Sequence, residues 1–310
     1  MKLSIVTTLY HSENYIEEFC RRASVAAENF AGEDFEIIFV NDGSPDDSLD
    51  KSVALASVDH HVIVIDLSRN FGHHNAMMAG LSHAVGDYVF LIDSDLEEEP
   101  EWLADFSTRM HDGKFDVVFG VQKTRKGKWF ERVSGEIYYW ILSWLLSIEH
   151  PKNITTARLM TRRYVRALLL HEEREIVISG LWLLTGFKQS QYSVHKKQGS
   201  RSTYSFRRKI SHLINVVTSF SSRPLILIFA TGMVILGVSI LYLSFLLIRR
   251  FFFLVPLDGW TSIMASIWLL GGITISFIGV IGIYLSKLFT EVKRRPTYIV
   301  KNRYGRRKEN

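Results

Sequence analysis

Asp93 and Asp95, two aspartates one residue apart, have the type and spacing of metal-binding carboxylates, and Glu97 follows them. The apolar run 87–92 before them predicts a buried strand, and Pro100 opens the helix that comes next. Carboxylates crowded this closely repel one another unless a cation lies among them, and oxygen-only ligands favour Mg²⁺ or Mn²⁺ over zinc. The stretch therefore predicts a divalent metal held by Asp93, Asp95 and Glu97. An isolated Asp-x-Asp is more often a solvated helix cap, so the surroundings have to decide.

Strand-like and helix-like segments alternate around this stretch. We expect strands at 3–9, 35–40, 61–66, 87–92 and 115–121, with helices at 13–29, 47–57, 75–85 and 100–112. This alternation predicts an α/β fold, a Rossmann-like, mostly parallel sheet with helices on both faces. Loops that follow parallel strands meet at one edge of the sheet, where ligands bind.

Three polar loops are expected at that edge, at 41–44, 68–72 and 93–95. A pocket that holds Asp42, Asp93, Asp95 and a metal suits a nucleotide diphosphate, because the metal neutralises the diphosphate and a carboxylate binds the nucleoside. No Gly-x-x-x-x-Gly-Lys-Ser/Thr motif is present, which argues against ATP or GTP hydrolysis. No Gly-x-Gly-x-x-Gly follows the first strand, which argues against a dinucleotide redox cofactor.

Two uncharged apolar runs, 225–248 and 263–286, each exceed the about 20 residues that span a bilayer. We therefore expect two transmembrane helices, and no signal peptide, since Met1 and Lys2 lead directly into a strand. The positive charge of the chain, +5 in net, is concentrated after residue 286, where the sequence has nine basic and two acidic residues. By the positive-inside rule, both ends of the hairpin lie in the cytoplasm, in contact with anionic lipid.

The expected domains are a cytoplasmic catalytic domain (1–204), a juxtamembrane helix (205–224), two transmembrane helices with a short loop (225–286) and a basic cytoplasmic tail (287–310). The aromatic segment 129–148 predicts a helix that is either core or lies at the membrane interface. The single cysteine, Cys20, permits no intramolecular disulfide and fits a reducing compartment.

Several motifs, in their order and spacing, resemble those of inverting family 2 glycosyltransferases with a GT-A fold. More narrowly the chain is similar to the polyprenyl-phosphate glycosyltransferases, which include bactoprenol glucosyltransferases and dolichyl-phosphate mannose synthases. The matching segments are Val40–Ser44, Ser68–His73 with Ala76 and Gly80, Asp93–Leu96 with Pro100 and Glu101, Glu173 and Arg174, Gly180–Trp182, Gly186–Gln189, Ser202–Tyr204, and Ser219–Ser221 with Pro224 and Leu225. The resemblance covers essentially the whole chain.

This resemblance implies roles for individual residues. The donor, a UDP- or GDP-linked sugar, would be bound by Thr8, Tyr10, Asp42, Asn70, Asp93, Ser94 and Arg201. Asp95 would bind the metal and act in catalysis, with Asp93 and Glu97 as further ligands of Mg²⁺ or Mn²⁺. Arg125 would meet a donor or acceptor phosphate. For Arg125 and Arg201, the sequence is equally compatible with a solvated charge on the surface that binds no phosphate.

Two departures from the family pattern affect the acceptor. Many relatives carry Asp-x-Gly-Asp-Phe-Arg-Leu, with an acidic residue assigned to catalysis, where this chain has no carboxylate in 153–160. Relatives also often have Gly-x-Arg where Gly120, Val121 and Gln122 stand. A sugar hydroxyl acceptor needs a base, but a lipid phosphate is already anionic and needs none. The missing carboxylate is thus compatible with a phosphate acceptor, and Arg158 becomes a predicted phosphate ligand.

We therefore expect a membrane enzyme that transfers a sugar from a nucleotide diphosphate sugar to polyprenyl (undecaprenyl) phosphate at the cytoplasmic membrane face. One alternative is a transferase acting on the hydroxyl of a lipid-linked glycan. Another is a non-catalytic membrane subunit that binds nucleotide sugar. Nucleic-acid binding is not expected, since only Tyr298 and Tyr304 interrupt the basic tail. Glycines at 271, 272, 279 and 282 would allow close helix contact, within one chain or in a homo-oligomer.

Overall fold

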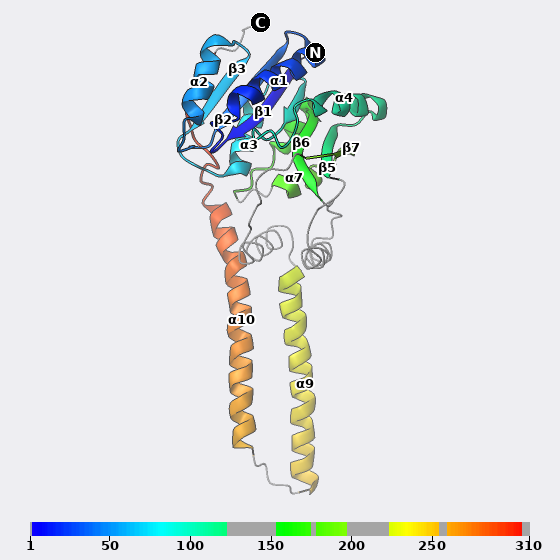
Figure 1. The fold of residues 1–310 in the computed structure, drawn as a ribbon. Coiled ribbons are helices and arrows are strands. Elements are labelled where there is room, and N and C mark those ends of the chain that lie inside the picture. Colours follow the sequence, from blue (N-terminus) through cyan, green and yellow to red (C-terminus); the bar gives the residue numbers. More distant parts are fainter. Residues whose placement is uncertain (1, 123–152, 175–177, 197–222, 254–258, 306–310) are drawn as a thin grey trace. The chain divides into compact units, whose positions relative to one another are not determined.

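The computed structural model describes residues 2–122, 153–174, 178–196, 223–253 and 259–305 (Figure 1). These residues belong to two compact units. One unit holds a β-sheet and its helices, including the residues from Arg295 onward, and the other holds two long helices. The boundary predicted near residue 204 lies outside the described residues.

The described strands form one mixed sheet, in the order β7-β5-β6-β4-β1-β2-β3-β8. Their bounds are β1 Leu3–Leu9, β2 Phe35–Asn41, β3 Val62–Leu67, β4 Tyr88–Leu91, β5 Val117–Gln122, β6 Ile154–Thr161, β7 Gln189–Val194 and β8 Val300–Tyr304. The four neighbours β4, β1, β2 and β3 run parallel, as do β5 and β7. Strands β6 and β8 run antiparallel to their neighbours.

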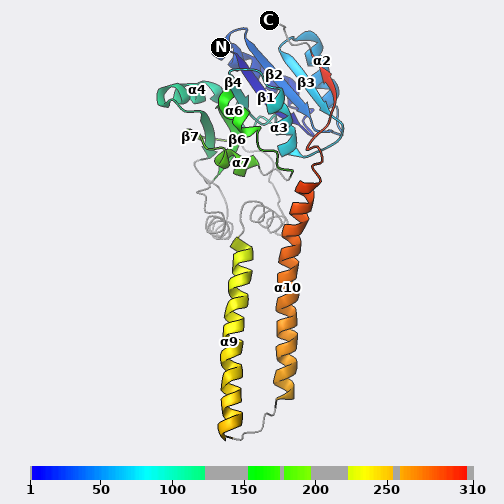
Figure 2. The same ribbon diagram turned by 180° about the vertical axis from the view of Figure 1, so that it is seen from behind.

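Helices cover both faces of the sheet, as the alternating pattern predicts (Figures 1 and 2). Their bounds are α1 Ile16–Ala31, α2 Ser48–Val58, α3 His73–His83, α4 Trp102–Gly113, α6 Arg162–Leu168 and α7 Ile178–Leu184. Leu3 and Ile5 of β1 share one buried cluster with the apolar sides of α1 and α4. Val6 points to the other face, where α3 packs so closely that a Cβ on Gly80 would lie 2.4 Å from Val6 Cγ1.

The expected fold class, a mostly parallel α/β sheet followed by two long apolar helices, is confirmed. The five strands and four helices predicted in the first 122 residues are present, with bounds within a few residues of those expected. Strands β6 and β7 were not predicted. β6 interrupts its apolar pattern with Thr156 and Arg158, and β7 is mostly polar, so neither has the continuous apolar run of a buried parallel strand.

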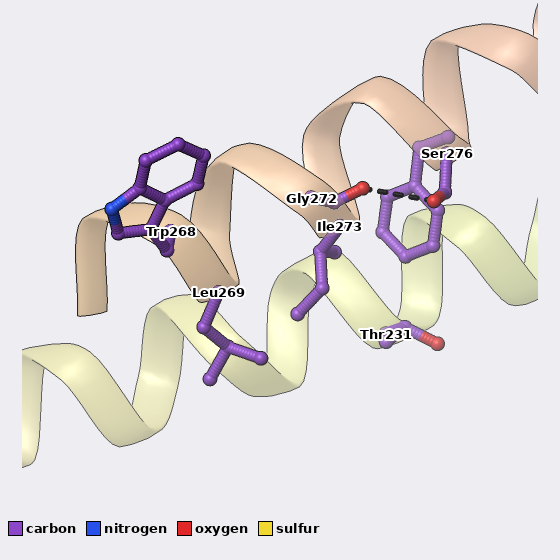
Figure 3. A pocket seen from close by; sticks show the side chains of 7 residues that line it. Thr231, Trp268, Leu269, Gly272, Ile273 and Ser276 are labelled. Carbon is purple, nitrogen blue, oxygen red and sulfur yellow. Dashed lines mark hydrogen bonds between the residues drawn. The ribbon is translucent and has the colours of Figure 1, made fainter. Parts of the chain in front are cut away.

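Helices α9 (Arg223–Phe253) and α10 (Trp260–Val292) contain the two predicted spans. Their windows 223–242 and 266–292 have mean hydropathies of 2.5 and 2.0 and bury none of their residues within the structure. A groove between the two helices is lined by Thr231 of α9 and by Trp268, Gly272 and Ser276 of α10 (Figure 3). The Ser276 hydroxyl donates to the carbonyl of Gly272 over 2.8 Å, so its polarity is satisfied within its own helix.

The stretch predicted as a basic tail contains an element of the sheet. Residues 300–304 form β8, which pairs antiparallel with β3 so that Tyr304 lies opposite Val64. The Ser68 amide donates to the carbonyl of Ile299 over 2.9 Å, and the Tyr298 hydroxyl lies 2.9 Å from Ser82 Oγ on α3. β8 thereby covers an edge of the sheet that would otherwise expose unpaired backbone groups.

Ending the chain after Arg295 should destabilise the protein, because β8 is lost from the edge of β3. Each backbone hydrogen bond contributes about 0.5–1.5 kcal/mol net, so we expect a loss of roughly 2 kcal/mol or more. Thermal unfolding in detergent measures the effect, and a chain that ends after Gly305 is the control. Equal midpoints for the two truncated chains would show that β8 contributes no stability.

Candidate functional site

The C-terminal ends of the parallel strands bring three loops together, as the sequence predicts. Asp42 follows β2, the segment Ser68–Gly72 follows β3, and Asp93 lies two residues beyond β4. Thr8 is the residue before the last in β1, and β1 pairs with both β2 and β4. These groups meet because parallel neighbours end at the same edge of the sheet.

The carboxylate of Asp42 binds two consecutive backbone amides of the neighbouring loop. The N–H of Phe71 donates to Oδ1 over 2.7 Å, and the N–H of Gly72 donates to Oδ2 over 3.0 Å. Asp42 is 2% exposed. Burial raises its pKa, although the two amides partly offset the effect. Asp42 therefore fixes the loop after β3, and each oxygen keeps a further lone pair for a ligand.

Gly43 lets the loops after β2 and β3 approach at the backbone. Its φ is +61°, and a Cβ at this position would lie 2.5 Å from the Asn70 nitrogen and 2.6 Å from the Arg69 carbonyl carbon. A side chain would thus be strained by the dihedral angle and blocked by backbone atoms that cannot rotate away. The glycine of the predicted turn is required for this contact.

His73, the first residue of α3, joins two of the predicted site residues. Its Nδ1 lies 3.0 Å from the Thr8 hydroxyl, and its Nε2 lies 3.4 Å from Oδ1 of Asp93. Burial opposes protonation of His73, but the Asp93 carboxylate outweighs it and raises its pKa. Burial likewise opposes ionisation of Asp93, and His73 outweighs it, which lowers the pKa of Asp93. The contact therefore favours the imidazolium form of His73 and the carboxylate form of Asp93.

Serine hydroxyls hold the Asp93 loop against β1. Ser94 donates to the carbonyl of Thr8 over 3.0 Å, its Oγ lies 3.1 Å from the hydroxyl oxygen of Ser12, and both serines are buried. Tyr10, 50% exposed, donates its amide to Ser12 Oγ over 3.1 Å. Asn70 is exposed at the rim. Thr8, Asp42, Asp93 and Ser94 thus converge, while Tyr10 and Asn70 flank them with side chains open to solvent.

Residues 93–99, which we call the acidic loop, follow β4. Oδ1 of Asp95 accepts the amide of Glu97 over 3.0 Å, and burial with the nearby charge of Asp93 raises the pKa of Asp95. Lys196, just beyond β7, places Nζ 3.1 Å from Oε2 of Glu97. Although burial opposes its charge, Glu98 and Glu97 raise the pKa of Lys196. The loop therefore has an internal cation.

Glu98 faces β6, within the segment 153–160 that contains no carboxylate. Its side chain is 0% exposed, and its oxygens accept the amides of Thr156 and Ala157 over 3.0 and 2.7 Å. Lys196 Nζ lies 3.6 Å away. Burial, together with the charge of Asp93, raises the pKa of Glu98 to about 7. Glu98 joins the acidic loop to β6 from inside, and because none of its side chain is exposed it does not reach a substrate as a base.

Arg158 does not join this group. Its side chain is 1% exposed and lies over the Trp182 ring, and its guanidinium donates to the carbonyls of Thr156 and Thr155 over 3.2 and 3.4 Å. Burial lowers its pKa to about 9. The expected contact with a substrate phosphate is therefore not supported by its position, because no face of the guanidinium reaches solvent. Arg125 and Arg201 lie outside the described residues.

Sequence reasoning missed three of the residues that hold the site together. His73 stands in a matching motif without a role of its own, Glu98 is one of several neighbouring acids, and Lys196 belongs to no motif. A signal existed for Lys196, because a run of carboxylates needs a cation and Lys196 and Lys197 follow a strand-length segment. Nothing in the spacing indicates which lysine turns toward the loop.

The acidic loop has the donor set of a divalent metal. Oδ1 of Asp93 is buried and faces His73 Nε2 at 3.4 Å, an ion pair that lacks hydrogen-bond geometry. The ligand atoms of Asp93, Asp95 and Glu97 do not converge within 4.8 Å, whereas those of Glu33, His60 and His61 do elsewhere on the described surface. Mg²⁺ is commonly held by one or two carboxylates together with substrate phosphates. The residues fit a metal that arrives with a diphosphate.

The chain is similar to known proteins in sequence and in fold. A model of Glycosyl transferase family 2 matches residues 4–169. A Mycobacterium tuberculosis (strain CDC 1551 / Oshkosh) chain described among the glycosyltransferases is 50% identical over 305 residues, covering 98% of this chain and 89% of the relative. The undecaprenyl-phosphate 4-deoxy-4-formamido-L-arabinose transferase of Enterobacter sp. (strain 638) is 30% identical over 308 residues, covering 96% and 92%. Glucosyl-3-phosphoglycerate synthase of M. tuberculosis has a TM-score of 0.48 at 18% identity, covering 71% of this chain and 80% of that chain.

Replacing Gly43 with alanine should disrupt the contact between the loops after β2 and β3. Gly32 is the matched control, because it shares a φ of +61° but has nothing within 4 Å of the position that a Cβ would take. Holding a side chain in a sparsely populated backbone conformation costs about 1–3 kcal/mol. We expect Gly32→Ala to lose about that much in chemical unfolding, and Gly43→Ala to lose more and to weaken nucleotide binding. Equal losses with equal nucleotide affinity would contradict the role of close approach.

Glu98→Gln should destabilise the protein, because an amide can accept only one of the two backbone N–H groups and turns its own NH₂ toward the other. An unsatisfied buried group costs about 1–3 kcal/mol. Chemical unfolding of the purified protein measures the loss. Glu17→Gln, at a solvent-exposed position of α1, is the control and should leave the midpoint unchanged. A midpoint for Glu98→Gln that matches this control would mean that Glu98 does not hold β6.

Proposed function

The chain belongs to glycosyltransferase family 2, and on this premise we propose that it transfers one sugar from a nucleotide diphosphate sugar to polyprenyl phosphate. The observation that carries the proposal is the meeting of Asp42, His73 and Asp93 at one sheet edge, in a chain that continues into two helices apolar enough to cross a membrane. The relative named as an undecaprenyl-phosphate sugar transferase, similar over 96% of this chain, supports the choice of acceptor.

The donor side of the proposal uses the rigid part of the site. Asp42 binds the nucleoside through the lone pairs that the Phe71 and Gly72 amides leave free. Thr8 and Ser94 form the floor, where each is already held by a hydrogen bond to His73 or to β1. Tyr10 and Asn70 flank the nucleoside from the rim, and Arg201 meets the diphosphate. UDP and GDP are both compatible with this arrangement.

Asp93, Asp95 and Glu97 would hold Mg²⁺ or Mn²⁺ together with the diphosphate. Bound there, the ion supplies positive charge that offsets the charge of the departing nucleoside diphosphate. Oδ1 of Asp93 supports this site, because its 3.4 Å contact with His73 Nε2 is an ion pair without hydrogen-bond geometry, which leaves the buried oxygen able to bind a cation. His73 contacts this same oxygen and holds Asp93 in place.

The acceptor attacks the anomeric carbon through an oxygen of its phosphate, opposite the nucleoside diphosphate. The new bond joins that oxygen to the anomeric carbon, the bond to the donor phosphate breaks, and the configuration inverts. A lipid phosphate is anionic at neutral pH, so no protein base is needed. The absence of a carboxylate in 153–160 and the enclosed position of Glu98 favour this acceptor over a glycan hydroxyl. Arg125 would meet the acceptor phosphate.

The two long helices would place this chemistry at the inner membrane. We propose that α9 and α10 span it, and that the sheet and both chain ends lie in the cytoplasm, as the basic residues after 286 favour. Held near the headgroups, the site would meet a lipid substrate already oriented. Gly271, Gly272 and Gly279 of α10 have open space around their Cα atoms, which would admit a second copy's helix.

Purified full-length protein with undecaprenyl phosphate and Mn²⁺ should move label from one UDP- or GDP-sugar into the organic phase. Asp95→Ala should lower the rate at least about 100-fold, because it removes a ligand of the metal ion whose charge offsets that of the leaving group. Asp112→Ala, on the exposed part of α4, should leave the rate unchanged. EDTA should abolish transfer, and added Mn²⁺ should restore it.

Two outcomes would contradict the proposal. Label that reaches only a soluble or lipid-linked glycan would identify a hydroxyl acceptor. Metal-dependent nucleotide binding with no transfer from any donor would identify a binding subunit.

A further inference from the structure

Lys196 is a cation enclosed among the carboxylates of the acidic loop. Its Nζ lies 3.1 Å from Oε2 of Glu97 and 3.6 Å from Oε1 of Glu98, and its side chain is 22% exposed. Its charge also acts on Asp93 and Asp95. Lys196 follows β7, and its contacts with Glu97 and Glu98 join the end of that strand to the acidic loop.

The surroundings of Lys196 explain why it stays there in the protein without metal. Glu98 is 0% exposed and is fixed by the amides of Thr156 and Ala157, so it cannot turn outward to water. A buried carboxylate needs a compensating charge. The ammonium provides it, and the same ammonium bonds Glu97, a proposed metal ligand.

We infer that Lys196 and the divalent metal compete for the acidic loop, with Lys196 holding the carboxylates together until the metal arrives. This inference rests on the proposed function, since it presupposes a metal at Asp93, Asp95 and Glu97. The ammonium and the ion repel each other, and Glu97 cannot bind both at full strength. Entry of the ion therefore requires Lys196 to move away from Glu97.

This competition makes metal binding depend on the nucleotide. Alone, the ion has to displace an ammonium that already satisfies Glu97 and Glu98. A nucleoside diphosphate adds negative charge at the same edge, so that both cations find partners at once. Metal and nucleotide should then strengthen each other's binding, as any coupling between two ligands is reciprocal.

The test measures Mn²⁺ binding, not turnover. Free Mn²⁺ is followed by electron paramagnetic resonance in a titration of detergent-solubilised full-length protein without nucleotide. Lys196→Met should bind Mn²⁺ about 10-fold more tightly than the wild type, within the range usual for such couplings. Lys196→Arg, which keeps the charge, should resemble the wild type. Lys188→Met is the matched control, because Lys188 Nζ bonds the carbonyl of Gly113 and not the acidic loop.

A second titration with UDP or GDP tests the coupling. The nucleotide should tighten Mn²⁺ binding in the wild type by more than it does in Lys196→Met, where the competing ammonium is absent. If thermal unfolding shows that Lys196→Met does not fold, Lys196→Gln, which can still donate to Glu97, takes its place in both titrations.

The Asp95→Ala variant distinguishes failure of the competition from failure of the proposed metal site. If Asp95→Ala loses Mn²⁺ binding while Lys196→Met binds as the wild type or more weakly, the metal site stands and the competition is wrong. If Asp95→Ala binds Mn²⁺ as well as the wild type, the proposed metal site and the competition both fail. If Lys196→Met binds no Mn²⁺ without nucleotide, the competition is also wrong.

Discussion

The arrangement of the site depends on one buried carboxylate that binds two consecutive amides. By holding the N–H groups of Phe71 and Gly72, Asp42 fixes where α3 begins. His73, the next residue, is then placed between Thr8 and Asp93. Strands β1, β2 and β4 and the loop after β3 are thus linked through a short series of polar contacts. The backbone approach at Gly43 leaves no space for this series to shift.

The acidic loop shows how such a concentration of negative charge is compatible with a folded protein. Asp93 faces His73, Glu97 faces Lys196, and Glu98 takes two backbone amides and also lies 3.6 Å from Lys196. Asp95 lies toward solvent and accepts an amide from within the loop. Partners of this kind reduce the cost of burying charge, which would otherwise be several kcal/mol per group. The loop is therefore ordered without relying on a bound ion.

The sequence was sufficient for the parts of the structure that local patterns control. Continuous apolar runs predicted β1 to β5, and polar residues after three of these strands predicted where Asp42 and Asp93 would meet. The antiparallel strand β6, the burial of Arg158 and the contacts of Lys196 depend on partners far apart in the chain. In the sequence, Arg158 looks the same as an arginine that binds phosphate. The position of Trp182 in the structure shows that it is enclosed. Spacing along a chain does not record which side chains a mixed sheet brings face to face.

The pairing of β8 with β3 has a topological consequence. Both strands belong to one folded sheet, so the chain between β7 and β8 has to leave and return on the same side of any membrane that it enters. The number of crossings in that interval must be even, whatever the charges at its ends. The edge of β3 also stays open during synthesis until the ribosome has passed α10, because its partner is made last. The sheet is completed only when the helical hairpin has already been synthesised.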